Sequence, residues 1–283
     1  MADIPHPEPA PYTGPSYFHV FKALVANSLA REMTLRGSFL ITVFTRGFWF
    51  AAQLMLFEII YGNVRDINGW TKYEFFIFMA TGMIINTLIE VFFMPNCANF
   101  SELIRTGNLD FVLLKPIDPQ FLVSCGEKLD LGALSNLLLS GSLLYWGASH
   151  LDQGVTFGQA FAYCGLIAVG VATFYSLMIS LAALSVFFGR NQGLYDFWFY
   201  ITIFARYPRD IYRNFWQGEI IYFVFSNIIP ILLIVTVPSS VLAGKILNPG
   251  YVWGILIGLT LLSLFIARRI FLWAIDNYRS SGS

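Results

Sequence analysis

Charged residues are scarce in this sequence. Asp, Glu, Lys and Arg make up 12% of its 283 residues, whereas 57% are hydrophobic. A soluble globular domain carries about a quarter charged residues, so this composition excludes an ordinary soluble protein. Several hydrophobic runs reach the roughly 20 residues that a helix needs to cross a bilayer, and they lack the alternation typical of a membrane β-barrel. The sequence therefore predicts an all-α polytopic membrane protein.

Residues and motifs that carry chemistry are also few. The three cysteines, Cys97, Cys125 and Cys164, lack the spacing of metal ligands, and the three histidines are dispersed. The sequence has no G-x-x-x-x-G-K-S/T loop, no H-E-x-x-H and no G-x-S-x-G motif. We therefore expect no catalytic residue, metal or cofactor in this chain, and no nucleic-acid partner.

The hydrophobic stretches predict six membrane crossings. Five candidate spans are 38–61, 73–95, 131–150, 157–188 and 251–271. With the N-terminus in the cytoplasm, eleven Lys and Arg residues fall on the inner side and six on the outer side. Cytoplasmic loops carry the excess of positive residues. The charges therefore predict that both termini are cytoplasmic.

The remaining crossing lies in the region 195–243, which has two interpretations. In the first, 195–207 is a short fifth span and 216–243 is a re-entrant element broken by two prolines. In the second, 190–213 lies on the cytoplasmic surface and 219–243 is the fifth span. The second interpretation improves the charge bias to fourteen against three. Both leave the total at six crossings.

The terminal regions differ from the hydrophobic spans. Residues 1–16 are rich in proline and are expected to form a cytoplasmic arm. Residues 17–37 show an apolar face and a basic face, which is typical of an amphipathic helix in the membrane interface. We expect this connecting helix to lead into a transmembrane domain of 38–275, followed by a cytoplasmic tail of 276–283.

The loop 100–119, with the sequence FSELIRTGNLDFVLLKPIDP, interrupts the hydrophobic pattern. Ser101 is predicted to cap a short helix over 102–106, and Gly107 is predicted to end it. A second short helix is predicted to start near Asp110 and to carry an apolar surface over 111–114. This pattern suits either a site that contacts another protein or an ordinary loop helix resting on the membrane.

The same loop carries a family resemblance. Its pattern I-x-x-G-x-L-D-x-x-L-x-K-P is occupied by Ile104, Gly107, Leu109, Asp110, Leu113, Lys115 and Pro116. A second match is ARYPRDIY at 205–212. The two together resemble the membrane subunits of type-2 ABC exporters, in particular the viologen-exporter-like permease family. The resemblance covers essentially the whole chain.

The resemblance implies a function and a set of partners. The loop helices would be coupling helices seated in a separate ATPase dimer, which would bind ATP and Mg²⁺. The permease would pair with a second copy or with a different permease in a bacterial inner membrane, and a re-entrant element would follow the fifth span on the outer side. The residues expected to contact the ATPase are Glu102, Arg105, Leu109, Asp110, Phe111, Leu113 and Lys115.

Aromatic residues, 17% of the chain, suggest the character of the substrate. Rings concentrated in one stretch suit amphiphilic, lipid-like or drug-like molecules, including cations. The candidates for the substrate path are Glu90, Phe197, Trp198, Tyr200 and Phe204. The rings are equally explained by helix packing and lipid contact, and Glu90 by an interfacial ion pair.

Two other functions remain open on the sequence alone. The chain suits a non-transporting scaffold or sensor that partners an ATPase. A lipid-modifying membrane enzyme is the other alternative, although the sequence offers no cluster of polar residues for its site.

Overall fold

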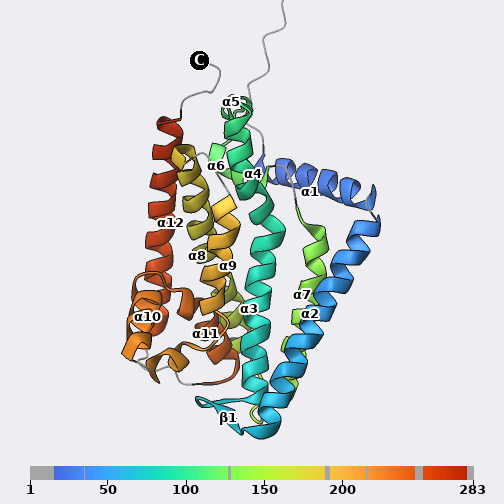
Figure 1. The fold of residues 1–283 in the computed structure, drawn as a ribbon, viewed down its shortest axis with the longest axis vertical. Helices are drawn as coiled ribbons and strands as arrows, with labels where there is room; N and C mark the ends of the chain where they lie inside the picture. The colour runs from blue at the N-terminus through green and yellow to red at the C-terminus, as the bar shows by residue number, and fades with distance from the viewer. Residues whose placement is uncertain are drawn as a thin grey trace, which may run out of the picture.

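The computed structural model describes residues 16–34, 36–126, 129–188, 192–214, 216–245 and 251–278. These residues form an elongated bundle of helices with short helices at both ends (Figure 1). We call the two ends the α5 end and the hairpin end, after the short helix α5 (Leu109–Leu113) and the hairpin of β1 and β2. The predicted arm 1–16 falls almost wholly outside the described residues, as does most of the tail 276–283.

The long helices run between these two ends. They are α2 (Arg36–Asn63), α3 (Lys72–Phe92), α7 (Leu134–Ser149), α8 (Phe157–Phe188), α9 (Gln192–Phe204) and α12 (Val252–Asp276). The remaining helices are α1 (Tyr17–Thr34), α4 (Met94–Arg105), α5, α6 (Pro119–Cys125), η1 (Leu131–Ala133), η2 (Arg209–Asn214), α10 (Trp216–Asn227) and α11 (Ile231–Leu242). Helix α1 lies across the bundle on the side of the α5 end (Figure 1).

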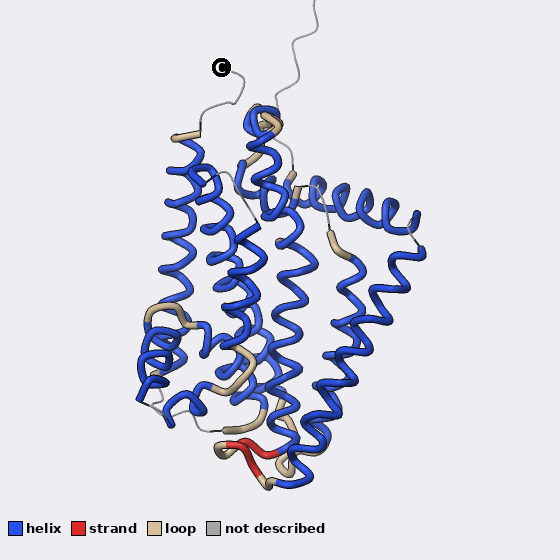
Figure 2. The backbone as a smooth tube through the Cα atoms, in the orientation of Figure 1, coloured by secondary structure: helices blue, strands red, loops and turns tan. Residues whose placement is uncertain are grey.

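A tight hairpin closes one end of the molecule (Figure 2). Strands β1 (Asp66–Ile67) and β2 (Trp70–Thr71) pair antiparallel across Asn68 and Gly69. Both turn residues have positive φ, 53° and 80°, as a two-residue type I′ turn requires. The Asn-Gly pair is the sequence signal for this turn. It was not among the sequence predictions above.

Helices α3 and α11 form the centre of the bundle. Helix α3 packs against α7, α8 and α11, and all twelve residues of α11 are buried. Helix α8 approaches them closely at Gly170, where an added Cβ would lie 2.9 Å from Ile234 and 3.0 Å from Ile85. Only a residue without a side chain fits this crossing.

Helices α8 and α12 pack through small polar side chains. Thr173 and Thr260 share a hydrogen bond of 2.7 Å, and Ser176 and Ser263 share one of 2.8 Å. In a membrane, an apolar side chain is equally well solvated by lipid tails and by a neighbouring helix. Close packing of small residues and hydrogen bonds between helices therefore determine which helix faces pair.

Four described helices are long and apolar enough to cross a membrane: Leu40–Asn63, Lys72–Arg105, Phe157–Phe187 and Val252–Asp276. A fifth is added if the bent pair Gly218–Asn227 and Ile231–Leu242, with an angle of 77° between its helices, counts as one span. The chain is therefore an all-α polytopic membrane protein. The predicted crossings at 131–150 and 195–207 correspond to the shorter helices α7 and α9, of 16 and 13 residues.

Helix boundaries at the α5 end differ from the prediction. Helix α4 runs unbroken from Met94 to Arg105, so Ser101 lies inside it and caps no helix. Helix α4 also follows α3 so closely that the two form one run of 34 residues. The predicted stop is correct, since Gly107 has a φ of 71° directly after α4. The predicted span 73–95 ended too early, because the helical run continues to Arg105 inside the loop 100–119.

Candidate coupling segment and membrane pocket

The predicted coupling loop consists of the end of α4, the short helix α5 and helix α6. Helix α5 lies farther along the bundle axis than α1, at the tip of the molecule (Figure 1). Gly107 reverses the chain between α4 and α5, and Asp118 caps α6 by accepting a hydrogen bond from the Phe121 amide at 3.1 Å. The segment is therefore a defined structure at the α5 end.

The side chains of α5 divide into two sets. Leu109 is fully buried, whereas Phe111 is 68% exposed and Leu114, which follows α5, is 80% exposed. Lys115 is exposed, and Asp110 and Leu113 are half-buried. Leu109 therefore supports the segment from within and offers no surface to a partner, in contrast to the expectation above. The apolar tip, which we define as Phe111 and Leu114, faces away from the chain's own core.

Glu102 and Arg105 lie beside this tip on the last turn of α4. Arg105 donates to both carboxylate oxygens of Glu102, with distances of 2.9 and 2.6 Å. Both side chains are exposed. Water screens exposed ion pairs, which therefore add little to stability, so this pair supplies surface charge near the tip rather than a structural anchor.

A polar network anchors α6 to the long helices. Arg268 of α12 donates to Asp118 at 2.5 and 3.0 Å and to Gln120 at 2.9 Å. Gln120 and Ser124 each hydrogen-bond the Tyr175 hydroxyl of α8, at 2.9 and 2.8 Å. The network joins the loop to α8 and α12. No sequence signal pointed to it, because the partners that it joins between α6 and the long helices lie more than 50 residues apart.

This network holds Asp118 as a carboxylate. Burial alone raises the pKa of the Asp118 carboxyl, but hydrogen bonds from Arg268 and from the Phe121 amide outweigh it. The pKa of Asp118 therefore lies below its ordinary value of 3.8. The ion pair with Arg268 stays formed at neutral pH.

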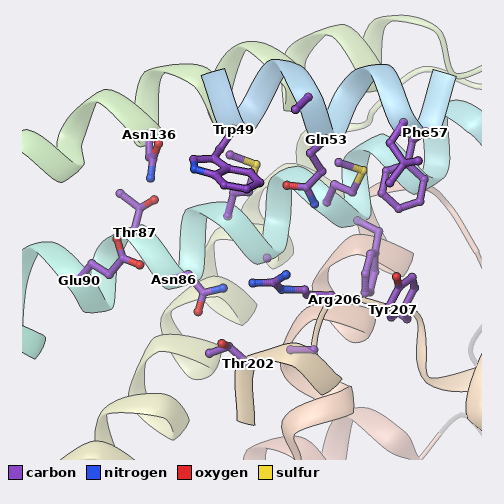
Figure 3. A pocket seen from close by; sticks show the side chains of 17 residues that line it. Trp49, Gln53, Phe57, Asn86, Thr87, Glu90, Asn136, Thr202, Arg206 and Tyr207 are labelled. Carbon is purple, nitrogen blue, oxygen red and sulfur yellow. The ribbon is translucent and has the colours of Figure 1, made fainter. Parts of the chain in front are cut away.

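A pocket of about 550 Å³ lies between α2, α3, α7 and the residues around the end of α9 (Figure 3). Its apolar lining is Trp49, Ala52, Leu56, Phe57, Phe78, Met79, Gly82, Met83 and Ala205. Its polar lining is Gln53, Asn86, Thr87, Glu90, Asn136, Thr202, Arg206 and Tyr207. The pocket is therefore amphipathic, as small-molecule sites commonly are.

Glu90 lies at one end of this pocket and is paired. Arg46 of α2 donates to Glu90 at 2.8 Å and lies 3.5 Å from Asp130. The ion pair that the sequence left as an alternative for Glu90 is thus present. Glu90 contributes a carboxylate that already has a cation partner.

Of the other candidates for the substrate path, Trp198, Tyr200 and Phe204 do not line the pocket. Trp198 is buried against Phe174, with ring centroids 4.9 Å apart, and Phe204 packs on Phe225 at 4.7 Å. Tyr200 is exposed, and the side chain of Phe197 lies outside the described set. The aromatic residues that line the pocket are Trp49, Phe57, Phe78 and Tyr207. The first three come from α2 and α3, where the sequence predicted only Glu90 as a candidate.

Comparisons with known proteins bear on both features. The profile of a family described as ABC-2 family transporter protein matches residues 48–282, most of the chain including the loop and the pocket. Neither the curated proteins nor the solved structures give a significant match. Because the family match covers well over half of the sequence, this multi-pass membrane protein belongs to the ABC-2 transporter family, as a permease subunit of an ABC transporter.

Proposed function

We propose that this chain is the permease of an ATP-driven exporter for an amphiphilic, lipid-like or drug-like substrate. The ATPase is a separate subunit that docks on the segment 100–119. The observation that carries the proposal is the apolar tip, where Phe111 and Leu114 are exposed at the end of the molecule. Large apolar side chains exposed in this way mark contact sites.

The position of α1 supports protein docking over contact with lipid. Helix α1 lies across the bundle and exposes apolar side chains such as Phe18 and Leu29, as an interfacial helix does. Helix α5 lies beyond the level of α1 (Figure 1). The run Lys72–Arg105 would be about 51 Å long, against about 30 Å for the hydrocarbon core. The tip therefore projects into water, where an apolar surface favours a protein partner.

The placement of η2 supports the first interpretation of 195–243. Segment η2 packs on α10 and α11, which lie at the hairpin end, opposite α5 (Figure 1). We infer that α9 is a short fifth span, that α10 and α11 form a re-entrant pair on the outer side, and that α7 and α12 complete six crossings. The α5 end and both termini are then cytoplasmic, in a bacterial inner membrane.

The α6 network supports a route for coupling. A partner that moves the tip would displace α6, and the contacts of Asp118 with Arg268 and of Ser124 with Tyr175 would carry this to α12 and α8. Helix α8 packs on both α11 and α3, and residues of α3 line the pocket. ATP binding by the partner would in this way shift the permease between two conformations.

Affinity purification of the tagged full chain from its native membrane in mild detergent tests the proposal. An ABC ATPase should copurify with the wild-type chain, together with a second permease if the pair is mixed. Phe111→Asp should reduce ATPase recovery about tenfold or more, because a charge replaces an exposed apolar contact. Phe157→Asp is the matched control, since Phe157 is also largely exposed, at 88% against 68% for Phe111, but lies at the hairpin end.

Two outcomes would overturn the docking assignment. One is that no ATPase copurifies under several mild conditions. The other is that Phe111→Asp and Phe157→Asp recover the same amount of ATPase. Substrate-stimulated ATP hydrolysis by the purified complex then separates an exporter from a scaffold or sensor. The amphipathic pocket supports the exporter.

A further inference from the structure

The pocket has a second charged residue whose situation differs from that of Glu90. Arg206 follows α9, and its guanidinium points toward Asn86 and Gln53 (Figure 3). The guanidinium lies over the Phe199 ring, with its Cζ atom 5.8 Å from the ring centroid. Within the described ranges, no carboxylate lies within ion-pair distance of Arg206. The positive charge at this end of the pocket thus lacks an anionic partner among the described residues.

The groups around Arg206 also have unused hydrogen-bonding capacity. Asn86 lines the pocket, and its side-chain amide carries two N–H donors that an anion could use. Its buried oxygen, which has no hydrogen-bond partner among the described residues, is an acceptor and would not bind the anion. Gln53 and Thr202 reach the same region from α2 and α9 (Figure 3). A guanidinium presents five N–H donors in a planar fork that matches a carboxylate or a phosphate, and amides and hydroxyls add further donors. Together these groups form a site for an anionic oxygen group.

The walls beside this polar region suit a hydrocarbon chain or ring. Trp49, Phe57 and Phe78 line the pocket together with Met79 and Met83. Arg206 is exposed beyond the end of α9 and lines the pocket. Charged residues that face a cavity in a membrane protein mark substrate pathways. A ligand that supplies the missing anion and fills the apolar walls satisfies both features at once.

We propose that the pocket binds an amphiphile through an anionic headgroup, a carboxylate or phosphate, held by Arg206 with Asn86 and Gln53. The identification of this ligand as the transported substrate rests on the exporter function proposed above. The proposal reverses the cation preference expected from Glu90. That carboxylate already has Arg46 as its partner, whereas Arg206 has no ionic partner among the described residues.

Tryptophan quenching by bromine-labelled amphiphiles tests this site in the purified full chain. The probes are 11-bromoundecanoate and 11-bromoundecyltrimethylammonium, in maltoside micelles, which contain no phosphate. Bromine quenches tryptophan on contact, and Trp49 lines the pocket. The carboxylate probe should quench the wild-type chain saturably, and Trp49→Phe should remove much of this quenching. The other six tryptophans supply the remaining signal.

Substitution of the arginine gives the decisive comparison. Arg206→Gln should weaken the carboxylate probe about tenfold and leave the ammonium probe unchanged, because only the former uses the guanidinium. Arg213→Gln is the matched control: Arg213 is exposed in η2, stacks over Tyr222 at 5.0 Å and does not line the pocket. It should leave both probes unchanged.

Competition with unlabelled phosphatidylglycerol identifies the source of the anionic group. Decanoate is the second competitor. If phosphatidylglycerol displaces the carboxylate probe at a lower concentration than decanoate does, the ligand is a membrane phospholipid. If decanoate displaces the probe at the lower concentration, the ligand is a single-chain amphiphile. Both results support an anionic site. Equal quenching in wild type and Arg206→Gln, or tighter binding of the ammonium probe, would overturn it.

The two proposals fail separately. Arg206→Gln should copurify with the ATPase as the wild-type chain does, because Arg206 lies far along the bundle from α5. ATPase copurification without Arg206-dependent quenching would refute the anionic site alone. Quenching without copurification would refute the docking assignment alone.

Discussion

Both ends of this molecule contain short helices next to prolines, but the short helix α11 is wholly buried whereas the short helix α5 exposes apolar side chains. At the α5 end, Phe111 and Leu114 are largely exposed. Toward the hairpin end, every residue of α11 is buried, and Lys245 binds the Gly69 carbonyl, Glu74 and the Trp70 ring. At the hairpin end the chain itself buries α11 and Trp70, although Phe157 is exposed there. At the α5 end no part of the described chain covers the apolar tip, and the proposed docking of a partner rests on this difference.

The largest expected effect on stability distinguishes the buried Leu109, which supports α5, from the exposed Phe111, which is proposed to contact the partner. Leu109→Asp places a carboxylate in a fully buried site and should cost several kcal/mol, because the charge loses its hydration. The segment 100–119 should then become sensitive to limited proteolysis, and ATPase recovery should fall with it. Phe111→Asp should lose the ATPase but keep the protease resistance of the wild-type chain. Equal proteolysis of the two variants would remove the distinction between tip and support.

The next effect tests the close packing of α11. Gly170→Leu should lower stability by about 1–3 kcal/mol, since the side chain would overlap Ile234 and Ile85. Thermal unfolding in detergent, followed by circular dichroism, measures the change. Gly165→Leu is the control on the same helix, because nothing lies within 4 Å of its added Cβ. Similar melting of both variants would show that α8 and α11 pack less tightly than described.

Removal of the Arg268 charge from the α6 network should have a smaller effect on stability. It should have a clear effect on the coupling of ATP hydrolysis to transport. Arg268→Gln should change stability by only about 1 kcal/mol, because the pair with Asp118 is partly exposed. ATP hydrolysis by the complex should continue while its link to transport weakens. Arg269→Gln is the neighbouring control, since Arg269 is exposed and lies over Phe265. If Arg268→Gln and Arg269→Gln transport the same amount of substrate per ATP hydrolysed, the proposed route from α6 to α12 and α8 is wrong.

The smallest effect is expected from pH. The pKa of Asp118 is lowered in the folded chain, so its pairing contributes stability above the ordinary value of 3.8 and loses it as pH falls through the lower folded value. The stability difference between the wild-type chain and Asp118→Asn should therefore be constant from about pH 5 to 8. Thermal unfolding at several pH values checks this. A difference that changed near pH 6 would mean that another group titrates in the network.

Several local features could be predicted from the sequence because they depend on neighbouring residues. Gly107 ends α4 through a positive φ, which glycine adopts without strain. The hydrophobic runs predict membrane helices, and Pro230 indicates the interruption between α10 and α11. Pro238, which was expected to break the same stretch, lies inside the continuous helix α11. The start of α4 was missed because Ser101 is a good cap only where a helix begins, and the preceding span was already helical.

The sequence by itself determined that this protein is a bundle of membrane helices with a structured loop, because hydrophobic length and glycine or proline positions act locally. Only the tertiary structure decided which side of that loop is buried, that Arg46 pairs with Glu90, and that Arg206 and Asn86 line the same pocket. In a membrane, lipid and protein core are both apolar, so hydrophobic periodicity does not identify the face that packs against the bundle. The pairing of distant polar residues depends on helix packing, which no single segment encodes.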